Sequence, residues 1–206
     1  MSKKGIFYIS FFVLLTLGFY FVSSALIPGF NKRSLEPISK VRDFKFTTQD
    51  GLPFTNKDVK GKVYVAEYFF TTCTGICPVM NTNMKKVYEK FGNNPDFLIV
   101  SHTCDPEKDT VGRLKLYADS MKVNTQKWVF VTGKKDSLYN MARLSYTIDD
   151  PANNLNSPED DFLHTQFWAL VNRQGDVVGI YDGLKQKEIK KLLKDIDKEL
   201  SKTSNL

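Results

Sequence analysis

The sequence VYVAEYFFTTCTGICP, residues 63–78, carries the clearest structural pattern of the chain. Its first eight residues are apolar almost throughout, which is typical of a strand buried within a sheet. Gly75 then permits a tight turn, and Pro78 suits the first position of a helix, where its missing N–H removes no hydrogen bond. The pattern predicts a buried strand that ends at a turn with two cysteines, Cys73 and Cys77, followed by a helix.

The spacing of Cys73 and Cys77 indicates chemistry rather than a structural role. Cys77 falls near the N-terminus of the predicted helix, where unpaired N–H groups and the helix dipole favour a thiolate. Thiolates are needed both to bind a metal ion and to exchange disulfides. The alternative is a pair of buried core cysteines, which their position around Gly75 at a strand-to-helix junction disfavours.

Strands and helices alternate along the remaining chain. Strands are expected at Phe44–Thr48, Leu52–Thr55, Val63–Phe70, Phe97–Thr103, Trp128–Val131, Phe167–Asn172 and Val177–Tyr181, and helices at Pro78–Phe91, Thr110–Met121, Ser137–Ser145 and Lys185–Ser201. Asp50-Gly51 and Gln174-Gly175 mark two hairpin turns. Because the cysteine pair follows the first central strand, this order predicts an α/β thioredoxin-like fold, in its peroxiredoxin-like variant, with a mixed sheet flanked by helices.

The N-terminal residues predict a transmembrane helix. The segment Ile6–Ile27 contains 22 uncharged residues, and about 20 apolar residues span the hydrocarbon core of a bilayer. Lys3 and Lys4 precede this segment, which places the N-terminus in the cytoplasm and the domain outside. The alternative is a signal peptide with its cleavage site at Ser23-Ser24-Ala25, but the apolar run is longer than a signal core of about 7–15 residues.

The expected organisation is a cytoplasmic tail at residues 1–5, a single transmembrane anchor at 6–27, a polar linker at 28–40 and a thioredoxin-like domain at 41–206. We expect the chain in the inner (cytoplasmic) membrane, with its domain on the periplasmic or extracytoplasmic side, where disulfides persist. The net charge of +6 does not indicate a nucleic-acid partner, because acidic residues interleave with the lysines of the last helix.

The two histidines of the chain differ in position. His102 falls inside an expected strand and is interpreted as a hydrogen-bonded residue of the sheet. His164 lies where a polar loop, Ile148–Asp161, meets a strand. Thioredoxin-like oxidoreductases have a cis-proline at this place, and a metal ligand instead of that proline favours binding over disulfide catalysis. Because the loop has few apolar groups, we expect it to hold His164 loosely until a metal binds.

Cys104 ends the strand that is expected beside Val63–Phe70, so it lies at the same sheet edge as the cysteine turn. We interpret it as a small buried apolar residue. The alternative is a third thiol that exchanges with the pair. Asp105-Pro106 and Asp109-Thr110 are interpreted as turn and helix-capping residues.

Three motifs resemble those of the Sco/SenC family of copper chaperones: CTGICP at 73–78, SHTCDPEKDT at 101–110 and FLHT at 162–165. The resemblance covers residues 40–200. It implies a thioredoxin-like fold, copper as Cu(I) or Cu(II) bound by Cys73, Cys77 and His164, and a role in building the copper site of cytochrome c oxidase. The chain departs from many family members at Leu163, where they have an acidic residue.

The implied ligands suit copper, because thiolates select Cu(I) and an imidazole completes a site that Cu(II) also accepts. Zinc binds the same ligand types, but no general base for hydrolytic zinc chemistry stands out near them. The first function is therefore a copper chaperone, a binding protein rather than an enzyme. Its expected partner is the copper-bearing subunit of cytochrome c oxidase or another copper chaperone.

The second function is a thiol–disulfide oxidoreductase that acts, through a disulfide between Cys73 and Cys77, on cysteines of an oxidase subunit or another exported protein. Such enzymes usually have two residues between their cysteines, whereas here there are three. A peroxidase is disfavoured, because peroxiredoxin-like enzymes have a threonine three residues before the reactive cysteine and this chain has Phe70.

Overall fold

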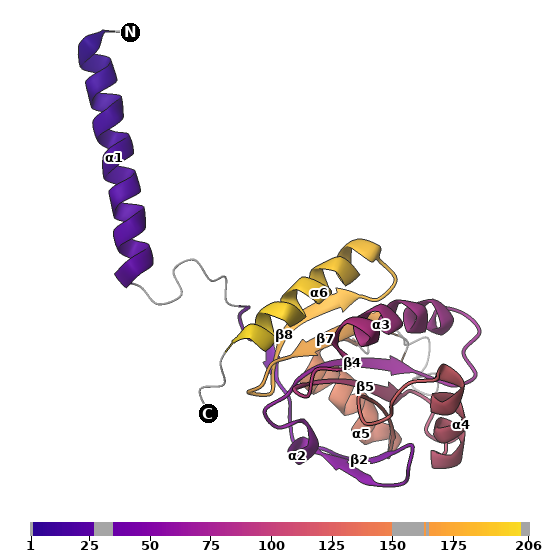
Figure 1. Cartoon of the computed structure of the whole chain (residues 1–206). Coiled ribbons are helices and arrows are strands. Elements are labelled where there is room, and N and C mark those ends of the chain that lie inside the picture. Colours follow the sequence, from indigo (N-terminus) through magenta and orange to yellow (C-terminus); the bar gives the residue numbers. More distant parts are fainter. Residues whose placement is uncertain (1, 27–34, 150–162, 164, 203–206) are drawn as a thin grey trace. The chain divides into compact units, whose positions relative to one another are not determined.

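The computed structural model describes residues 2–26, 35–149, 163 and 165–202 (Figure 1). The chain divides into two compact units, Met1–Glu36 and Pro37–Leu206. The first unit contains α1 (Lys3–Leu26), whose apolar side chains are largely exposed. Its segment Lys3–Ser24 is long and apolar enough to cross a membrane. A signal sequence would meet the same two criteria of length and composition.

In the described part of the second unit, eight strands form one mixed sheet with the order β1-β8-β7-β4-β5-β6-β2-β3. The strands are β1 (Ser39–Lys40), β2 (Lys45–Thr48), β3 (Pro53–Thr55), β4 (Val63–Phe69), β5 (Phe97–Thr103), β6 (Trp128–Thr132), β7 (Phe167–Val171) and β8 (Asp176–Asp182). The neighbouring strands β4, β5 and β6 are parallel, and the other pairs are antiparallel. The mixed sheet and both hairpins are therefore confirmed.

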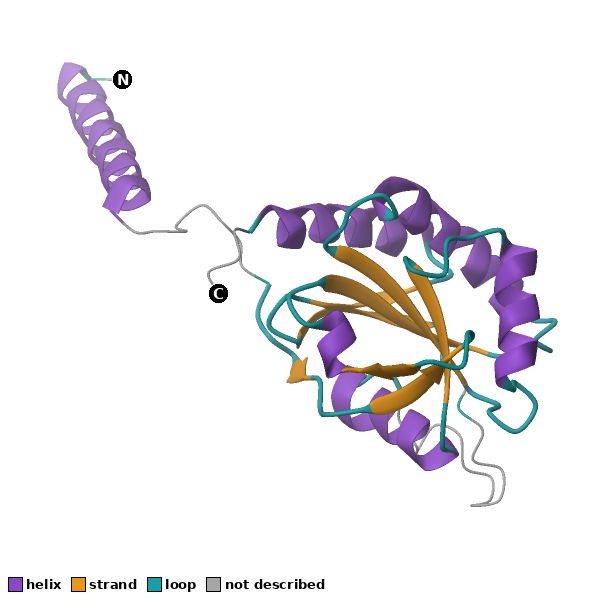
Figure 2. Cartoon of the chain, turned by 60° about the horizontal axis from the view of Figure 1, so that its bottom comes forward, coloured by secondary structure: helices purple, strands orange, loops and turns teal. Residues whose placement is uncertain are grey.

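Helices cover both sides of this sheet (Figure 2). They are α2 (Asn56–Val59), α3 (Cys77–Phe91), α4 (Val111–Met121), α5 (Lys135–Asn140), the π-helix η1 (Met141–Tyr146) and α6 (Gln186–Ser201). Because side chains alternate along a strand, β4 contributes to two cores. Tyr68 packs with α5 and donates its hydroxyl to the Leu138 carbonyl (2.7 Å). Phe69 faces the opposite side and stacks on Tyr117 of α4, with ring centroids 5.1 Å apart.

Three elements differ from the sequence prediction. Ser39 and Lys40, within the expected linker, form β1 by pairing with β8. The four residues of α2 form a helix because Thr55 and Asp58 make a reciprocal capping box. The helix expected at Ser137–Ser145 begins earlier and continues as η1, which ends in a left-handed residue, Thr147.

The direction of the strands sets where a site forms. Parallel strands β4 and β5 end at one edge of the sheet, and β7 begins there because it runs antiparallel to β4. The turn after β4, Cys104 after β5 and the residues before β7 therefore converge. In open α/β sheets, ligands bind outside the carboxyl ends of the parallel strands.

Candidate metal centre

Cys73 and Cys77 lie together at this sheet edge. The N–H of Cys73 donates to the carbonyl of Phe70 (3.1 Å), which closes the turn after β4. Cys77 is the first residue of α3, and Ile76 is its N-cap. Cys73 is half-buried and Cys77 is buried, and both side chains line the same cavity. Both are free thiols.

The surroundings of Cys77 act against the thiolate that its place at the helix N-terminus favours. Burial raises the pKa of Cys77, and its hydrogen bond with Cys73 raises that pKa further. Desolvation disfavours the charged sulfur and therefore acts against the thiolate that a helix N-terminus favours. Metal binding or disulfide formation must therefore displace a proton from Cys77.

The buried carboxylate of Asp109 holds the start of the cysteine turn. It accepts hydrogen bonds from the N–H of Thr71 (3.1 Å), from the hydroxyl of Thr71 (2.5 Å) and from the hydroxyl of Thr103 (2.6 Å). Arg113 lies 3.9 Å from the same carboxylate and donates to Thr71 (2.6 Å). Capping was predicted correctly for Thr110, the N-cap of α4. Asp109 instead fixes the position of the cysteine turn, a role that no local sequence pattern indicates.

A cavity of about 360 Å³ opens beside the cysteines. Its lining includes Cys73, Cys77, Cys104, Leu163 and Thr165. Cys104 is buried, and this burial raises its pKa well above the ordinary value. The interpretation of Cys104 as a small buried residue agrees with this environment.

His102 is a buried residue of β5, as predicted. Its ring stacks on Tyr68 with centroids 4.9 Å apart, and its Nδ1 lies 3.4 Å from the carbonyl oxygen of Glu67. Burial lowers the pKa of His102 to about 4, so the ring is neutral at physiological pH. It does not line the cavity.

The predicted ligand His164 lies outside the described residues, as do residues 150–161 of the loop before it. Its neighbours Leu163 and Thr165 are both buried, and both line the cavity with the cysteines. Within the described ranges, no group of three His, Cys, Asp or Glu residues is arranged to hold a metal ion. The described part brings two thiols to the cavity, which suit a soft ion such as Cu(I).

Comparison with known proteins identifies the relatives of this chain. The SCO1/SenC family model matches residues 32–201. A SCO1 protein homolog of Bacillus subtilis is 29% identical over 187 residues, which cover 88% of this chain and 93% of that protein. A Stutzerimonas stutzeri protein, named as copper-binding, is 26% identical over 163 residues, with 76% of each chain covered.

A solved structure of a Sco family protein has a similar fold. It is BsSco, described as a member of the Sco family of cytochrome c oxidase assembly proteins with a disulfide switch. The TM-score is 0.67 at 27% identity, and the match covers 81% of this chain and 96% of BsSco. The predicted thioredoxin-like fold is confirmed, and the chain belongs to the SCO1/SenC family.

Proposed function

We propose that this chain is a copper chaperone in which Cys73, Cys77 and His164 bind copper. The observation that carries the proposal is the cavity at the sheet edge, where both thiols lie with Leu163 and Thr165, the residues on either side of His164. The relative named as copper-binding supports copper as the cargo. BsSco, described as an oxidase assembly protein, supports delivery to the copper site of cytochrome c oxidase or help in maturing it.

The expected setting follows from α1. An uncleaved α1 anchors the chain in the inner membrane, and the domain faces the periplasmic side. The partner there is the copper-bearing oxidase subunit or another copper chaperone. Because Cu(I) binds thiolates, loading displaces protons from thiol ligands, and copper affinity should rise with pH.

A second function, thiol–disulfide exchange, is favoured by the unequal burial of the two cysteines. Cys73 is half-buried and Cys77 is buried beside it. In an exchange reaction Cys73 is the accessible sulfur that a partner disulfide reaches, and Cys77 then closes the internal disulfide. The disulfide switch described for BsSco supports this alternative.

Copper titration of the full chain in detergent, against a coloured Cu(I) chelator, tests the proposal. Reduced wild-type protein should bind one ion per chain, and the double variant Cys73→Ser/Cys77→Ser should bind none. His164→Ala should bind more weakly, because it removes one of three ligands. Cys104→Ala is the matched control: it removes a buried thiol that is not proposed as a ligand and should retain the ion.

Two results separate the functions. Copper binding that survives the double cysteine substitution would place the site elsewhere and overturn the proposal. If the wild-type chain binds no copper but reduces a disulfide-bearing peptide, and His164→Ala does so equally fast, the oxidoreductase is the correct function, because exchange needs no imidazole.

A further inference from the structure

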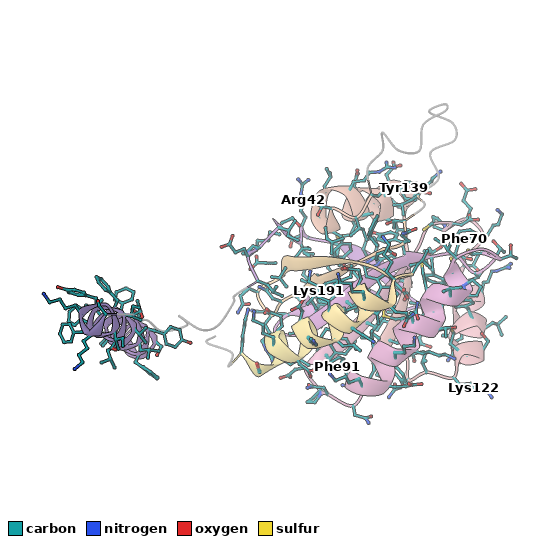
Figure 3. The ribbon with its side chains drawn as sticks, turned by 90° about the horizontal axis from the view of Figure 1, so that it is seen from above. Arg42, Phe70, Phe91, Lys122, Tyr139 and Lys191 are labelled. Carbon is teal, nitrogen blue, oxygen red and sulfur yellow. The ribbon has the colours of Figure 1, made fainter. Side chains whose placement is uncertain are left out.

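The hydroxyl of Tyr139 joins two segments that line the cavity. Tyr139 projects from α5 and is 3% exposed (Figure 3). Its hydroxyl donates to the carbonyl of Cys104 (2.9 Å) and accepts a hydrogen bond from the N–H of Leu163 (3.2 Å). Cys104 in turn donates its N–H to the carbonyl of Phe69 (2.8 Å), in the strand that leads to Cys73. Hydrogen bonds thus connect the residue before His164 to the cysteine turn.

The ring of Tyr139 is held by two cations. Lys135 Nζ lies 5.2 Å from the ring centroid, and the Arg143 guanidinium lies 5.3 Å from it. Arg143 also donates to the carboxylate of Asp149 (2.8 Å), which is 3% exposed. These contacts hold the ring of Tyr139 in place.

The two described neighbours of His164, Leu163 and Thr165, are both held by hydrogen bonds. Leu163 is fully buried, and its N–H is bound by Tyr139. Thr165 donates its hydroxyl to the carbonyl of Ile148 (2.6 Å) and accepts from the N–H of Phe167 (3.1 Å). The described residues on either side of His164 are thus anchored, whereas the expectation of a loosely held His164 concerns residues outside those described.

We propose that Tyr139 is a positioning residue of the copper centre: its hydroxyl fixes the backbone at Leu163, the residue directly before the proposed ligand His164. This inference rests on the proposed function. Without the hydroxyl, the N–H of Leu163 and the carbonyl of Cys104 lose a buried hydrogen-bond partner, so the backbone at Leu163 is no longer fixed. Groups that orient a metal ligand typically contribute about 10-fold to 100-fold in affinity.

Tyr139→Phe in the full chain tests this, since it removes the hydroxyl and keeps the ring. Copper affinity should fall about 10-fold to 100-fold, and the thiolate-to-Cu(II) absorption band should shift. In a His164→Ala background the same substitution should leave affinity nearly unchanged, because the ligand that it positions is gone. Tyr181→Phe is the matched control: Tyr181 is also buried, and its hydroxyl donates to Asp195 (2.8 Å), away from the cavity.

The outcomes are distinguishable. If His164→Ala weakens binding and Tyr139→Phe does not, the proposed function stands and the role of Tyr139 is overturned. If Tyr139→Phe lowers copper affinity equally in the presence and in the absence of His164, the role of Tyr139 is also overturned, because the effect is then general destabilisation. Tyr139→Phe is introduced into both the wild-type and the His164→Ala background. A lower melting temperature caused by this substitution therefore affects both backgrounds alike and does not disturb the comparison. If His164→Ala binds copper like the wild type, the proposed ligand set and this inference fail together.

Discussion

Glu67 on β4 and His102 on β5 are both fully buried, and burial moves their pKa values in opposite directions. Burial raises the pKa of Glu67 to about 7, against the effect of the Ser101 hydroxyl, which donates to the carboxylate (2.6 Å). Within the described residues, the second carboxylate oxygen of Glu67 and Nε2 of His102 have no hydrogen-bond partner. With the pKa of His102 lowered to about 4, both side chains are uncharged between roughly pH 4 and pH 7.

These shifts predict a pH dependence of stability. The folded protein holds the Glu67 proton more tightly than the unfolded chain, so this residue's contribution falls as pH rises from about 4.5 to 7. His102 acts oppositely, because its contribution is present above about 6.5 and is lost as pH falls to about 4. In the wild type the two trends largely cancel between pH 5 and pH 8, and Glu67→Gln should remove one of them.

Urea unfolding at pH 5 and pH 8 measures this effect. Going from pH 5 to pH 8, the free energy of unfolding of Glu67→Gln should rise by about 2 to 3 kcal/mol more than that of the wild type. Glu107→Gln, which replaces an exposed carboxylate, serves as the control and should follow the wild type. An identical pH dependence in Glu67→Gln and the wild type would show that Glu67 does not titrate in this range.

At the scale of elements, the end of η1 contains backbone strain. Thr147 is its C-cap and has φ 54° and ψ 37°, a left-handed conformation that a β-branched residue rarely adopts. The next residue, Ile148, accepts the hydrogen bond from Thr165 beside the candidate metal centre. Strained residues persist where the surrounding structure over-determines them, often near functional sites.

Thr147→Gly should therefore stabilise the protein by about 1 kcal/mol, since relieved strain of about 1–3 kcal/mol exceeds the extra entropy of glycine in the unfolded chain, about 0.5–1 kcal/mol. Lys122→Gly is the matched control at the C-cap of α4, with φ 54° and ψ 44° but an unbranched side chain. Lys122→Gly should raise the free energy of unfolding by less than Thr147→Gly does, because an unbranched side chain is less strained in this conformation. Urea midpoints measure both. A less stable Thr147→Gly would mean that the hydrogen bond from the threonine hydroxyl to Tyr146 (2.8 Å) compensates for the strain.

Long apolar patterns made most elements predictable. The strand expected at Phe97–Thr103 has those bounds in the structure, and its apolar run Phe97–Val100 is the pattern that indicated it. β1 has two residues and α2 has four, too few for any periodicity to develop. The π-helix was not predicted either, since its hydrogen bonds differ from those of an α-helix by one residue and apolar spacing does not resolve that difference.

At the scale of the whole molecule, the candidate site combines residues that sequence patterns locate with others that only tertiary structure brings in. Cys73 and Cys77 were placed at the sheet edge from their motif. Asp109 and Tyr139 were not recognised as supports, because their partners are distant in sequence: Asp109 binds Thr71 across 38 positions, and Tyr139 binds Cys104 across 35. An isolated tyrosine or aspartate carries no local pattern that reveals such a partner.

Whether α1 is retained or cleaved decides whether the protein is anchored in the membrane or secreted. Lys3 and Lys4 precede its apolar residues, so the N-terminus should stay in the cytoplasm. An alkaline phosphatase fusion after residue 206 should be active, because that enzyme needs disulfides that form outside the cytoplasm, whereas a fusion before Lys3 should be inactive. Mass spectrometry of the membrane fraction should find Met1–Ile27 retained. A mature N-terminus near Leu26 would show that α1 is a cleaved signal peptide, and an inactive C-terminal fusion would place the domain in the cytoplasm.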